Sequence, residues 1–187
     1  MAFFEGIKMT GGYGNGPDII NSCSVDVNRG EIVSILGPNG AGKSTTLKMI
    51  AGFLSPDTGS IHLSGVEVQK NEVAFKKKIG YLPESNPLYE DLFVVEFLNF
   101  LANVHAIPSP SKRIEEVIAL TGLQSMQHKK IGFLAKGFKQ RVGIAAAILH
   151  APELILLDEP TAGLDPNQLI EIRGLIQSLS KDAMILF

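Results

Sequence analysis

The stretch that decides the fold of this chain is Gly37-Pro38-Asn39-Gly40-Ala41-Gly42-Lys43-Ser44, which fits the pattern G-x-x-x-x-G-K-[ST]. A predicted strand, Ile32 to Leu36, precedes it, and a helical pattern from about Gly42 to Gly52 follows it. In this context the glycines allow several backbone N–H groups to point into one concavity that binds phosphate. The sequence therefore predicts a P-loop NTPase fold with a nucleotide site.

The last residues of the loop have predictable chemical roles. The positive end of the helix dipole would lie beneath the bound phosphates. Lys43 can reach the β- and γ-phosphate oxygens, which makes it a candidate catalytic residue, and the Ser44 hydroxyl can bind Mg²⁺. The predicted nucleotide contacts are Gly37, Asn39, Gly40, Ala41, Gly42, Lys43, Ser44 and Thr45.

A second polar group follows the apolar segment Leu154 to Leu157, which predicts a buried strand. Asp158 and Glu159 come directly after it, and ligands of open α/β sheets bind at the carboxyl ends of the strands. Asp158 is the candidate partner of Mg²⁺ and of the nucleotide. Glu159 is the candidate catalytic residue that orients and deprotonates the attacking water.

Composition limits the other possibilities. A chain of 187 residues fits one domain, and 17 Lys+Arg against 19 Asp+Glu leaves no basic excess for binding nucleic acid. With 45% hydrophobic residues the chain can form a core, so intrinsic disorder is excluded. One cysteine, Cys23, excludes a disulfide framework, and no apolar run is long enough to cross a bilayer. These features are typical of a cytosolic α/β protein.

Glycine and proline divide the chain into three zones. The first zone has short strands, with Asn28-Arg29-Gly30 as an expected hairpin connection, and the last combines a strand with a helix from about Pro166 to Leu179. The middle zone, about 86–150, is helical, and Ser111 is the expected N-cap of its second helix. We expect an α/β fold with a mostly parallel sheet covered by helices, a small antiparallel β subdomain and an inserted α-helical subdomain.

Further motifs occur in an order that resembles the nucleotide-binding subunits of ATP-binding cassette (ABC) transporters over essentially the whole chain. Tyr13 matches the aromatic residue that stacks on adenine in this family. Residues 79–84 match the loop before the helical subdomain, residues 134–141 match the signature segment, and residues 162–165 match the loop that communicates across the dimer. The resemblance implies an ATPase, with ATP and Mg²⁺ as ligands.

The resemblance also implies a head-to-tail dimer in which the signature of one copy completes the site of the other. The signature residues that would act across the dimer are Ala135, Lys136, Gly137 and Phe138, and Asp165 would mediate communication. Glu84 stands where the family usually has a glutamine, and its carboxylate could still meet Mg²⁺. Ala135 replaces the serine that donates to the γ-phosphate, so we expect weaker dimerisation and slower turnover.

By the same resemblance the partner is a transmembrane permease, and the protein lies in the cytoplasm against the inner face of the membrane. Phe93, Phe97 and Phe100 are candidates for its docking groove, with ordinary core packing as the alternative. Residues 81–89 and 136–141 resemble export cassettes of the ABC-2 and gliding-motility type. The first ~50 residues resemble cassettes for branched-chain amino-acid uptake, so both directions of transport, and a mosaic chain, stay open.

The resemblance further predicts one ABC domain, with a core of residues 1–85 and 151–187 and a helical subdomain of about 86–150. Family members continue past the strand that matches Ala183–Phe187 and carry a histidine there. We therefore expect a truncated domain that still binds ATP, hydrolyses it poorly and exposes an unpaired sheet edge. Two alternatives remain: a soluble ABC ATPase of DNA repair or translation, and a nucleotide-binding module with little hydrolysis.

Overall fold

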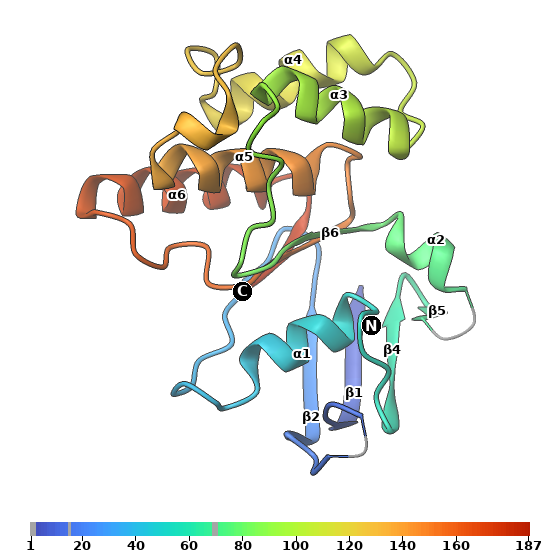
Figure 1. Ribbon diagram of the computed structural model, residues 1–187. Coiled ribbons are helices and arrows are strands. Elements are labelled where there is room, and N and C mark those ends of the chain that lie inside the picture. Colours follow the sequence, from blue (N-terminus) through green and yellow to red (C-terminus); the bar gives the residue numbers. More distant parts are fainter. Residues whose placement is uncertain (1–2, 15, 69–70) are drawn as a thin grey trace.

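The computed structural model describes residues 3–14, 16–68 and 71–187, so the first two residues of the predicted first zone lie outside it. Within these ranges the strands form two four-stranded sheets, and helices pack against both (Figure 1). The helices are α1 (Lys43–Ile50), α2 (Glu72–Lys76), α3 (Val94–Val104), α4 (Pro110–Thr121), α5 (Lys136–Ile148) and α6 (Pro166–Leu179), with a 3-10 turn at Ile131–Phe133.

One sheet is antiparallel and has the order β2-β1-β4-β5. Its strands are β1 (Phe4–Gly11), β2 (Ile20–Val27), β4 (Thr58–Leu63) and β5 (Val66–Glu67). The sequence did not predict β1, although it lies between two partners. Lys8 has a φ of 47° and the pairing register shifts between Gly6 and Met9, so a bulge breaks the two-residue period by which a strand is identified.

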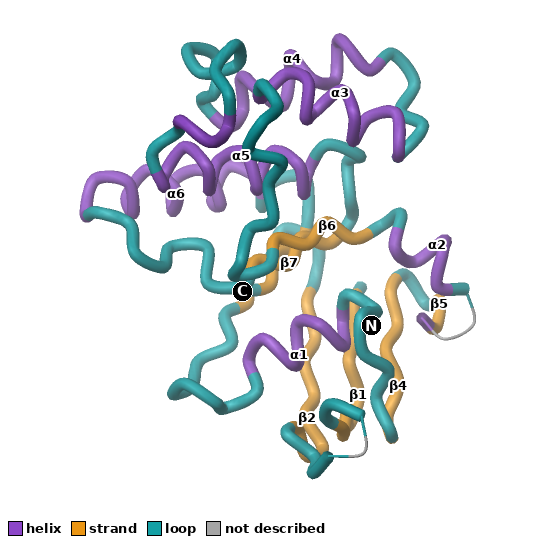
Figure 2. The backbone as a smooth tube through the Cα atoms, viewed as in Figure 1, coloured by secondary structure: helices purple, strands orange, loops and turns teal. Residues whose placement is uncertain are grey.

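The other sheet is parallel and has the order β3-β8-β7-β6. Its strands β6 and β7 are labelled in Figure 2. Its strands are β3 (Ile32–Val33), β8 (Met184–Leu186), β7 (Leu154–Leu157) and β6 (Ile79–Leu82). The predicted first strand of this sheet, Ile32 to Leu36, is therefore shorter than expected. Strand β8 pairs with β7 on one side and with β3 on the other, so the terminal run lies inside this sheet, whose outer strands are β3 and β6.

Two local predictions are also wrong. The turn at Asn28 exists, because the Glu31 N–H donates to the Asn28 carbonyl over 3.1 Å, but it does not close a hairpin. Strand β2 pairs with β1 in the antiparallel sheet and β3 pairs with β8 in the parallel sheet, so the turn joins the two sheets. The N-cap of α4 is Ser109 rather than Ser111, because Pro110 occupies the first helical position.

Strand β7 explains why helices cover both faces of the parallel sheet, as the sequence predicts. Leu154 and Leu156 belong to the buried cluster that includes α1, whereas Ile155 and Leu157 belong to the cluster that includes α5 and α6. All four side chains are at most 2% exposed. Burying each one stabilises the fold by about 1.5–3 kcal/mol, so the strand is fixed in register.

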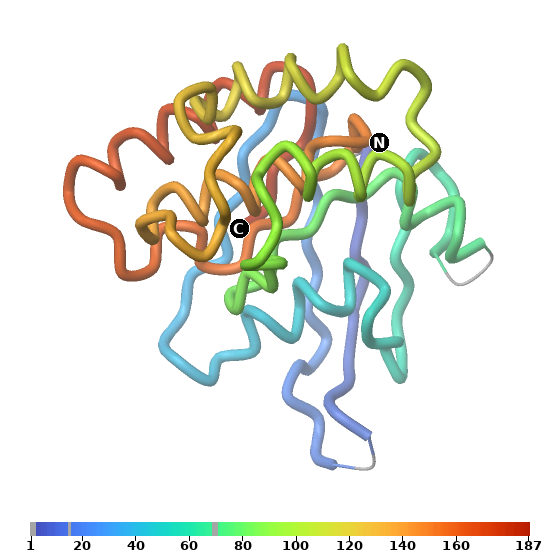
Figure 3. Tube along the Cα trace, turned by 45° about the horizontal axis from the view of Figure 1, so that its top comes forward, coloured from blue at the N-terminus to red at the C-terminus, as the bar shows by residue number. Residues whose placement is uncertain are grey.

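The inserted helices form a layer of their own. Helices α3 and α4 pack against each other and against α5, and in the turned view they follow the green-to-yellow part of the trace (Figure 3). Among the described residues, no helix is both long enough and apolar enough to cross a membrane.

Candidate nucleotide-binding site

The loop between β3 and α1 has the backbone that a phosphate cradle requires. Gly40 and Gly42 have φ values of 84° and 86°, which side chains rarely adopt. A Cβ at Gly42 would also lie 3.2 Å from Ile20 Cγ1, so this glycine is needed for space as well as for conformation. Gly42 is the N-cap of α1, and the first N–H groups of that helix face the loop.

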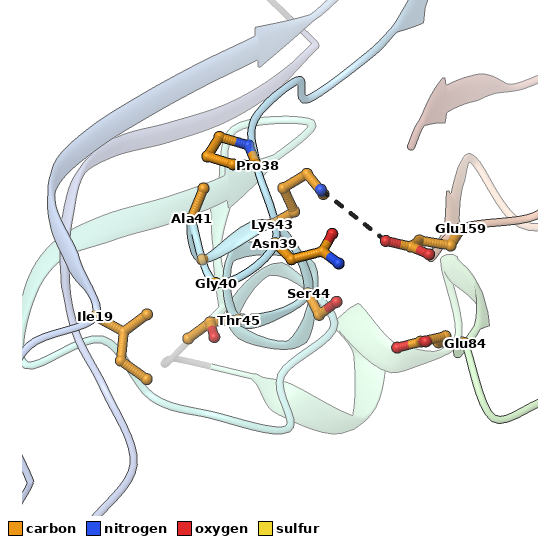
Figure 4. Close-up of a pocket in the computed structure, with 11 residues that line it drawn as sticks. Ile19, Pro38, Asn39, Gly40, Ala41, Lys43, Ser44, Thr45, Glu84 and Glu159 are labelled. Atoms are coloured by element: carbon orange, nitrogen blue, oxygen red, sulfur yellow. Dashed lines mark ion pairs between the residues drawn. The ribbon is translucent and has the colours of Figure 1, made fainter. Parts of the chain in front are cut away.

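The loop opens into a cavity of about 360 Å³ (Figure 4). Most of the residues that line this cavity are ones that the sequence predicts as nucleotide contacts. Glu84 and Glu159 line the opposite side. The lining residues are Ile19, Pro38, Asn39, Gly40, Ala41, Gly42, Lys43, Ser44, Thr45, Glu84 and Glu159. Gly37 lines a neighbouring cavity of about 240 Å³ together with Lys43, Asp158 and Glu159.

Lys43 lies between these two cavities. Its ammonium donates to the Gly37 carbonyl over 2.8 Å and lies 4.0 Å from Glu159 Oε1, as the dashed line in Figure 4 marks. Such a partly exposed ion pair is worth at most about 1 kcal/mol, so a phosphate could displace the carboxylate at little cost. The contact places the two predicted catalytic side chains within one ion-pair distance.

Ser44 and Asp158 meet although 114 residues separate them, because the Ser44 hydroxyl donates to Asp158 Oδ1 over 2.9 Å. Asp158 is only 3% exposed, and its backbone N–H donates to the Leu82 carbonyl over 2.8 Å, which holds it at the end of β7. The Ser44 hydroxyl and the Asp158 carboxylate, with the Glu84 carboxylate in the cavity that Ser44 also lines, are the hard oxygen donors that Mg²⁺ prefers. The residues therefore fit this cation.

Glu159 has a φ of 50°, in the left-handed region that a glutamate rarely occupies. Backbone strain of this kind costs about 1–3 kcal/mol and is typical of functional sites. The Glu159 carbonyl accepts from the Ala162 N–H over 3.1 Å, so the strained residue is held in a turn directly after Asp158. Its side chain lines both cavities beside the loop.

Tyr13 lies outside the lining of these cavities but close to them. It is 45% exposed, and its hydroxyl accepts a hydrogen bond of 3.1 Å from Lys48 Nζ. Hydrogen bonding by the Thr45 hydroxyl, and then by Lys48, lowers the pKa of the Tyr13 phenol. Sequence reasoning missed both Lys48 and Ile19, since neither belongs to a recognisable pattern, although Lys48 lies one helical turn after Thr45.

The predicted signature residues lie elsewhere. Ala135 is the N-cap of α5, its side chain makes no capping bond, and Lys136 to Phe138 form the first turn. Residues 135–138 are absent from the lining of the described cavity around the loop. The Asp165 carboxylate caps α6, accepting from the Gln168 N–H over 2.9 Å. Their roles across a dimer stay predictions.

A further cavity of about 260 Å³ lies between β6 and the inserted helices, lined in part by Pro87, Leu88 and Phe97. Phe97 is only 5% exposed and belongs to the core, so the interpretation as an exposed docking residue is wrong for it. Phe93 and Phe100 are exposed at 37% and 44%.

His105 and His150 form another part of this wall. Their rings stack with centroids 4.2 Å apart, and burial lowers the pKa of His150 to about 4. The stacked pair therefore stays neutral at pH 7.

The fold, the phosphate loop and the Ser44–Asp158 contact define a nucleotide-binding domain of the P-loop class. A model of the family described as ABC transporter matches residues 20–162, and the chain belongs to this family. The expectation that the chain belongs to the ABC transporter family is therefore confirmed, and so is the expected α/β P-loop fold.

Particular relatives can be named. The chain is 41% identical over 167 residues to the bacitracin transport ATP-binding protein BcrA of Bacillus licheniformis, covering 89% of this chain and 54% of that protein. It is 38% identical over 172 residues to the ABC transporter ATP-binding protein YxlF of Bacillus subtilis, covering 91% and 57%. The chain thus spans about half the length of these curated relatives.

A solved structure of CbiO1 from Clostridium perfringens, described as part of the ABC transporter complex CbiONQ, is similar to the whole fold. It superposes with a TM-score of 0.88 at 29% identity, covering 99% of this chain and 77% of that chain. The likeness extends over both sheets and the inserted helices.

Proposed function

We propose that the chain binds ATP with Mg²⁺ and hydrolyses it, as the ATP-binding part of an ABC transporter that drives a membrane permease. The observation that supports this most is the contact of Ser44 with Asp158 beside Lys43 and Glu159. In this contact, side chains from two distant segments lie together: Lys43 and Ser44 from the loop, and Asp158 and Glu159 from the end of β7. We assign them to the phosphates, the cation and the attacking water.

In this proposal the backbone N–H groups of the loop and the N-terminus of α1 hold the phosphates. Lys43 moves from Glu159 to the β- and γ-phosphate oxygens. Ser44 and Asp158, with Glu84, would hold Mg²⁺, which when bound neutralises charge on the phosphates. Glu159 orients a water and takes its proton, the water oxygen bonds to the γ-phosphorus, and the bond to the ADP oxygen breaks.

Lys43→Met is expected to weaken ATP binding by about 10- to 200-fold, because charge-assisted hydrogen bonds contribute about 1.5–3 kcal/mol. Isothermal titration calorimetry with ATP and Mg²⁺ measures this affinity. Lys76→Met is the matched control, since Lys76 pairs with Glu72 on the surface helix α2 and does not line the described cavity around the loop. Equal affinities for the two variants would contradict the proposed site.

The second copy in this proposal presents residues 135–138 to the nucleotide of the first, and Asp165 mediates communication across the dimer. The signature residues lie at the N-terminus of α5, whose dipole and backbone N–H groups suit a phosphate, and they do not line the cavity of their own chain. This placement supports a head-to-tail arrangement in which each signature meets the partner's loop.

Ala135→Ser restores a hydroxyl at that N-cap. We expect the ATP-dependent dimer to become about tenfold tighter and turnover to rise, because one hydrogen bond to a charged group is regained. Sedimentation of the Glu159→Gln background with ATP, with and without the added serine, measures the dimer. An unchanged dimer constant would show that this position does not meet the partner's phosphate.

The permease is proposed to dock on α3, where Phe93 at the N-cap and Phe100 within the helix are exposed and whose Phe97 and Leu101 line the cavity next to β6. This places the chain on the inner face of the membrane. Relatives named for bacitracin transport and linearmycin resistance favour the export-type interpretation of residues 81–89 and 136–141.

A further inference from the structure

Tyr13 is held by a helix that also carries the phosphate-binding residues. We propose that Lys48 forms a latch on the Tyr13 hydroxyl that holds the ring where the nucleotide base stacks, so that Lys48 is a positioning residue for the base. This inference rests on the proposed function, because the stacking role of Tyr13 is itself a proposal.

The latch follows from helix geometry. Thr45 and Lys48 are three residues apart on α1, so their side chains lie on the same face of that helix. Thr45 is 5% exposed and lines the phosphate cavity, whereas Lys48 reaches outward to the aromatic ring. The Lys48 ammonium lies 3.1 Å from the Tyr13 oxygen and 5.4 Å from the ring centroid. One short helix thereby fixes both the phosphate site and the ring.

Among the described residues of the segment around Tyr13, the backbone makes few bonds of its own. The Tyr13 carbonyl accepts from the Gly16 N–H over 3.1 Å, and the next described backbone bond runs from Ile19 to Gly11 over 3.0 Å. Gly14 has a φ of 57° with open space where a Cβ would stand. The side chain is 45% exposed, so the bond from Lys48 to its hydroxyl restricts torsions that packing leaves partly free.

The pKa of Tyr13 agrees with this geometry. Hydrogen bonding by Thr45, and then by Lys48, lowers the pKa of the phenol although burial raises it, and the Lys48 ammonium is the donor seen 3.1 Å from the phenol oxygen. The other two tyrosines serve as internal references in the same chain, since burial raises the pKa of Tyr81 and Tyr89 lies in the inserted helical region. Removing Lys48 should therefore return the Tyr13 pKa toward its usual value.

The experiment compares ATP with inorganic tripolyphosphate, which offers the same phosphates without a base. Affinities of both are measured by calorimetry for the wild type, Tyr13→Ala, Tyr13→Phe and Lys48→Met, with Lys76→Met as the control. Restoring freedom to one side chain costs about two- to tenfold in affinity. We expect Tyr13→Phe and Lys48→Met to weaken the affinity for ATP by that factor and Tyr13→Ala to weaken it further. The affinity for tripolyphosphate should stay unchanged in all three variants.

Each other result overturns the latch in a distinguishable way. If Tyr13→Ala weakens ATP binding while Tyr13→Phe and Lys48→Met do not, the ring stacks without a latch. If Lys48→Met weakens ATP and tripolyphosphate equally, Lys48 acts on the phosphates. If Tyr13→Ala leaves the ratio of the two affinities unchanged, the stacking role itself is wrong, while tripolyphosphate binding still supports the phosphate site.

A spectroscopic titration tests the latch without any nucleotide. The difference in ultraviolet absorbance between the wild type and Tyr13→Phe isolates the ionisation of Tyr13. The same difference in the Lys48→Met background should appear at higher pH. An unchanged midpoint would contradict the contact between Lys48 and the phenol.

Discussion

Glu159→Gln is expected to slow ATP hydrolysis by roughly 10²–10⁴-fold while leaving ATP bound, because glutamine keeps the shape of the side chain but cannot accept a proton. Glu159 is placed for this role by its strained turn after β7 and by its position in the cavity wall beside Lys43. Single-turnover release of phosphate measures the chemical step. Equilibrium ATP binding, measured on the same samples, should change little.

Glu153→Gln is a suitable control. Glu153 precedes β7 at its other end and pairs with Lys78 over 2.9 Å, away from the cavity. Normal hydrolysis by Glu153→Gln together with slow hydrolysis by Glu159→Gln supports the assignment. If the wild type and Glu159→Gln both bind ATP and are equally inactive, the chain acts as a nucleotide-binding module and the proposed hydrolysis is wrong.

Gly80→Ala is expected to destabilise the fold by about 3 kcal/mol, which corresponds to a fall in Tm of roughly 6–12 °C for a chain of this size. A Cβ at this position would lie 2.1 Å from the Ala147 carbonyl oxygen and 3.0 Å from Pro152 Cγ. The oxygen belongs to the backbone of α5 and cannot rotate away, so β6 and α5 would have to separate. Thermal unfolding followed by circular dichroism measures the change.

Gly174→Ala is the matched control for that substitution. Gly174 lies within α6 and has open space where a Cβ would stand. Alanine is favoured over glycine in a helix by about 1 kcal/mol, so this variant should be more stable than the wild type. A loss of stability in both variants would mean that the lack of space around Gly80 is not the reason why Gly80→Ala is destabilising.

The parts of the fold that sequence reasoning predicted most accurately are those with one dominant local signal. Strand Leu154–Leu157 and helix Pro166–Leu179 have the bounds expected from the sequence, and in the structure Asp165 and Pro166 begin the helix. The phosphate loop was predictable for the same reason, since glycine and lysine at fixed spacing have few other uses. Ser44 and Asp158 were each predicted to bind the cation, and the structure brings them into contact.

The predictions that failed depend on contacts between distant segments. The local sequence of the turn at Asn28 fits both a hairpin, in which its flanking strands pair with each other, and a connection between two sheets. The pairing of Met184–Leu186 on both sides depends on β3 and β7, which lie far away in the sequence. Phe97 shares its residue type and neighbourhood with the exposed Phe93 and Phe100, and only its packing in the helical layer separates them. Lys48 was missed because its partner, Tyr13, lies 35 residues away.

The hydrogen bond between Ser44 and Asp158 has a consequence for how the molecule acquires its activity. It closes a loop of more than a hundred residues, so the cation site cannot exist until the last strands have joined the sheet. ATP with Mg²⁺ would bind only to the folded chain and would draw the folding equilibrium toward it, by about 2.7 kcal/mol at a hundredfold excess over Kd. The substrate of the proposed reaction would thus also promote the folding of its own binding domain.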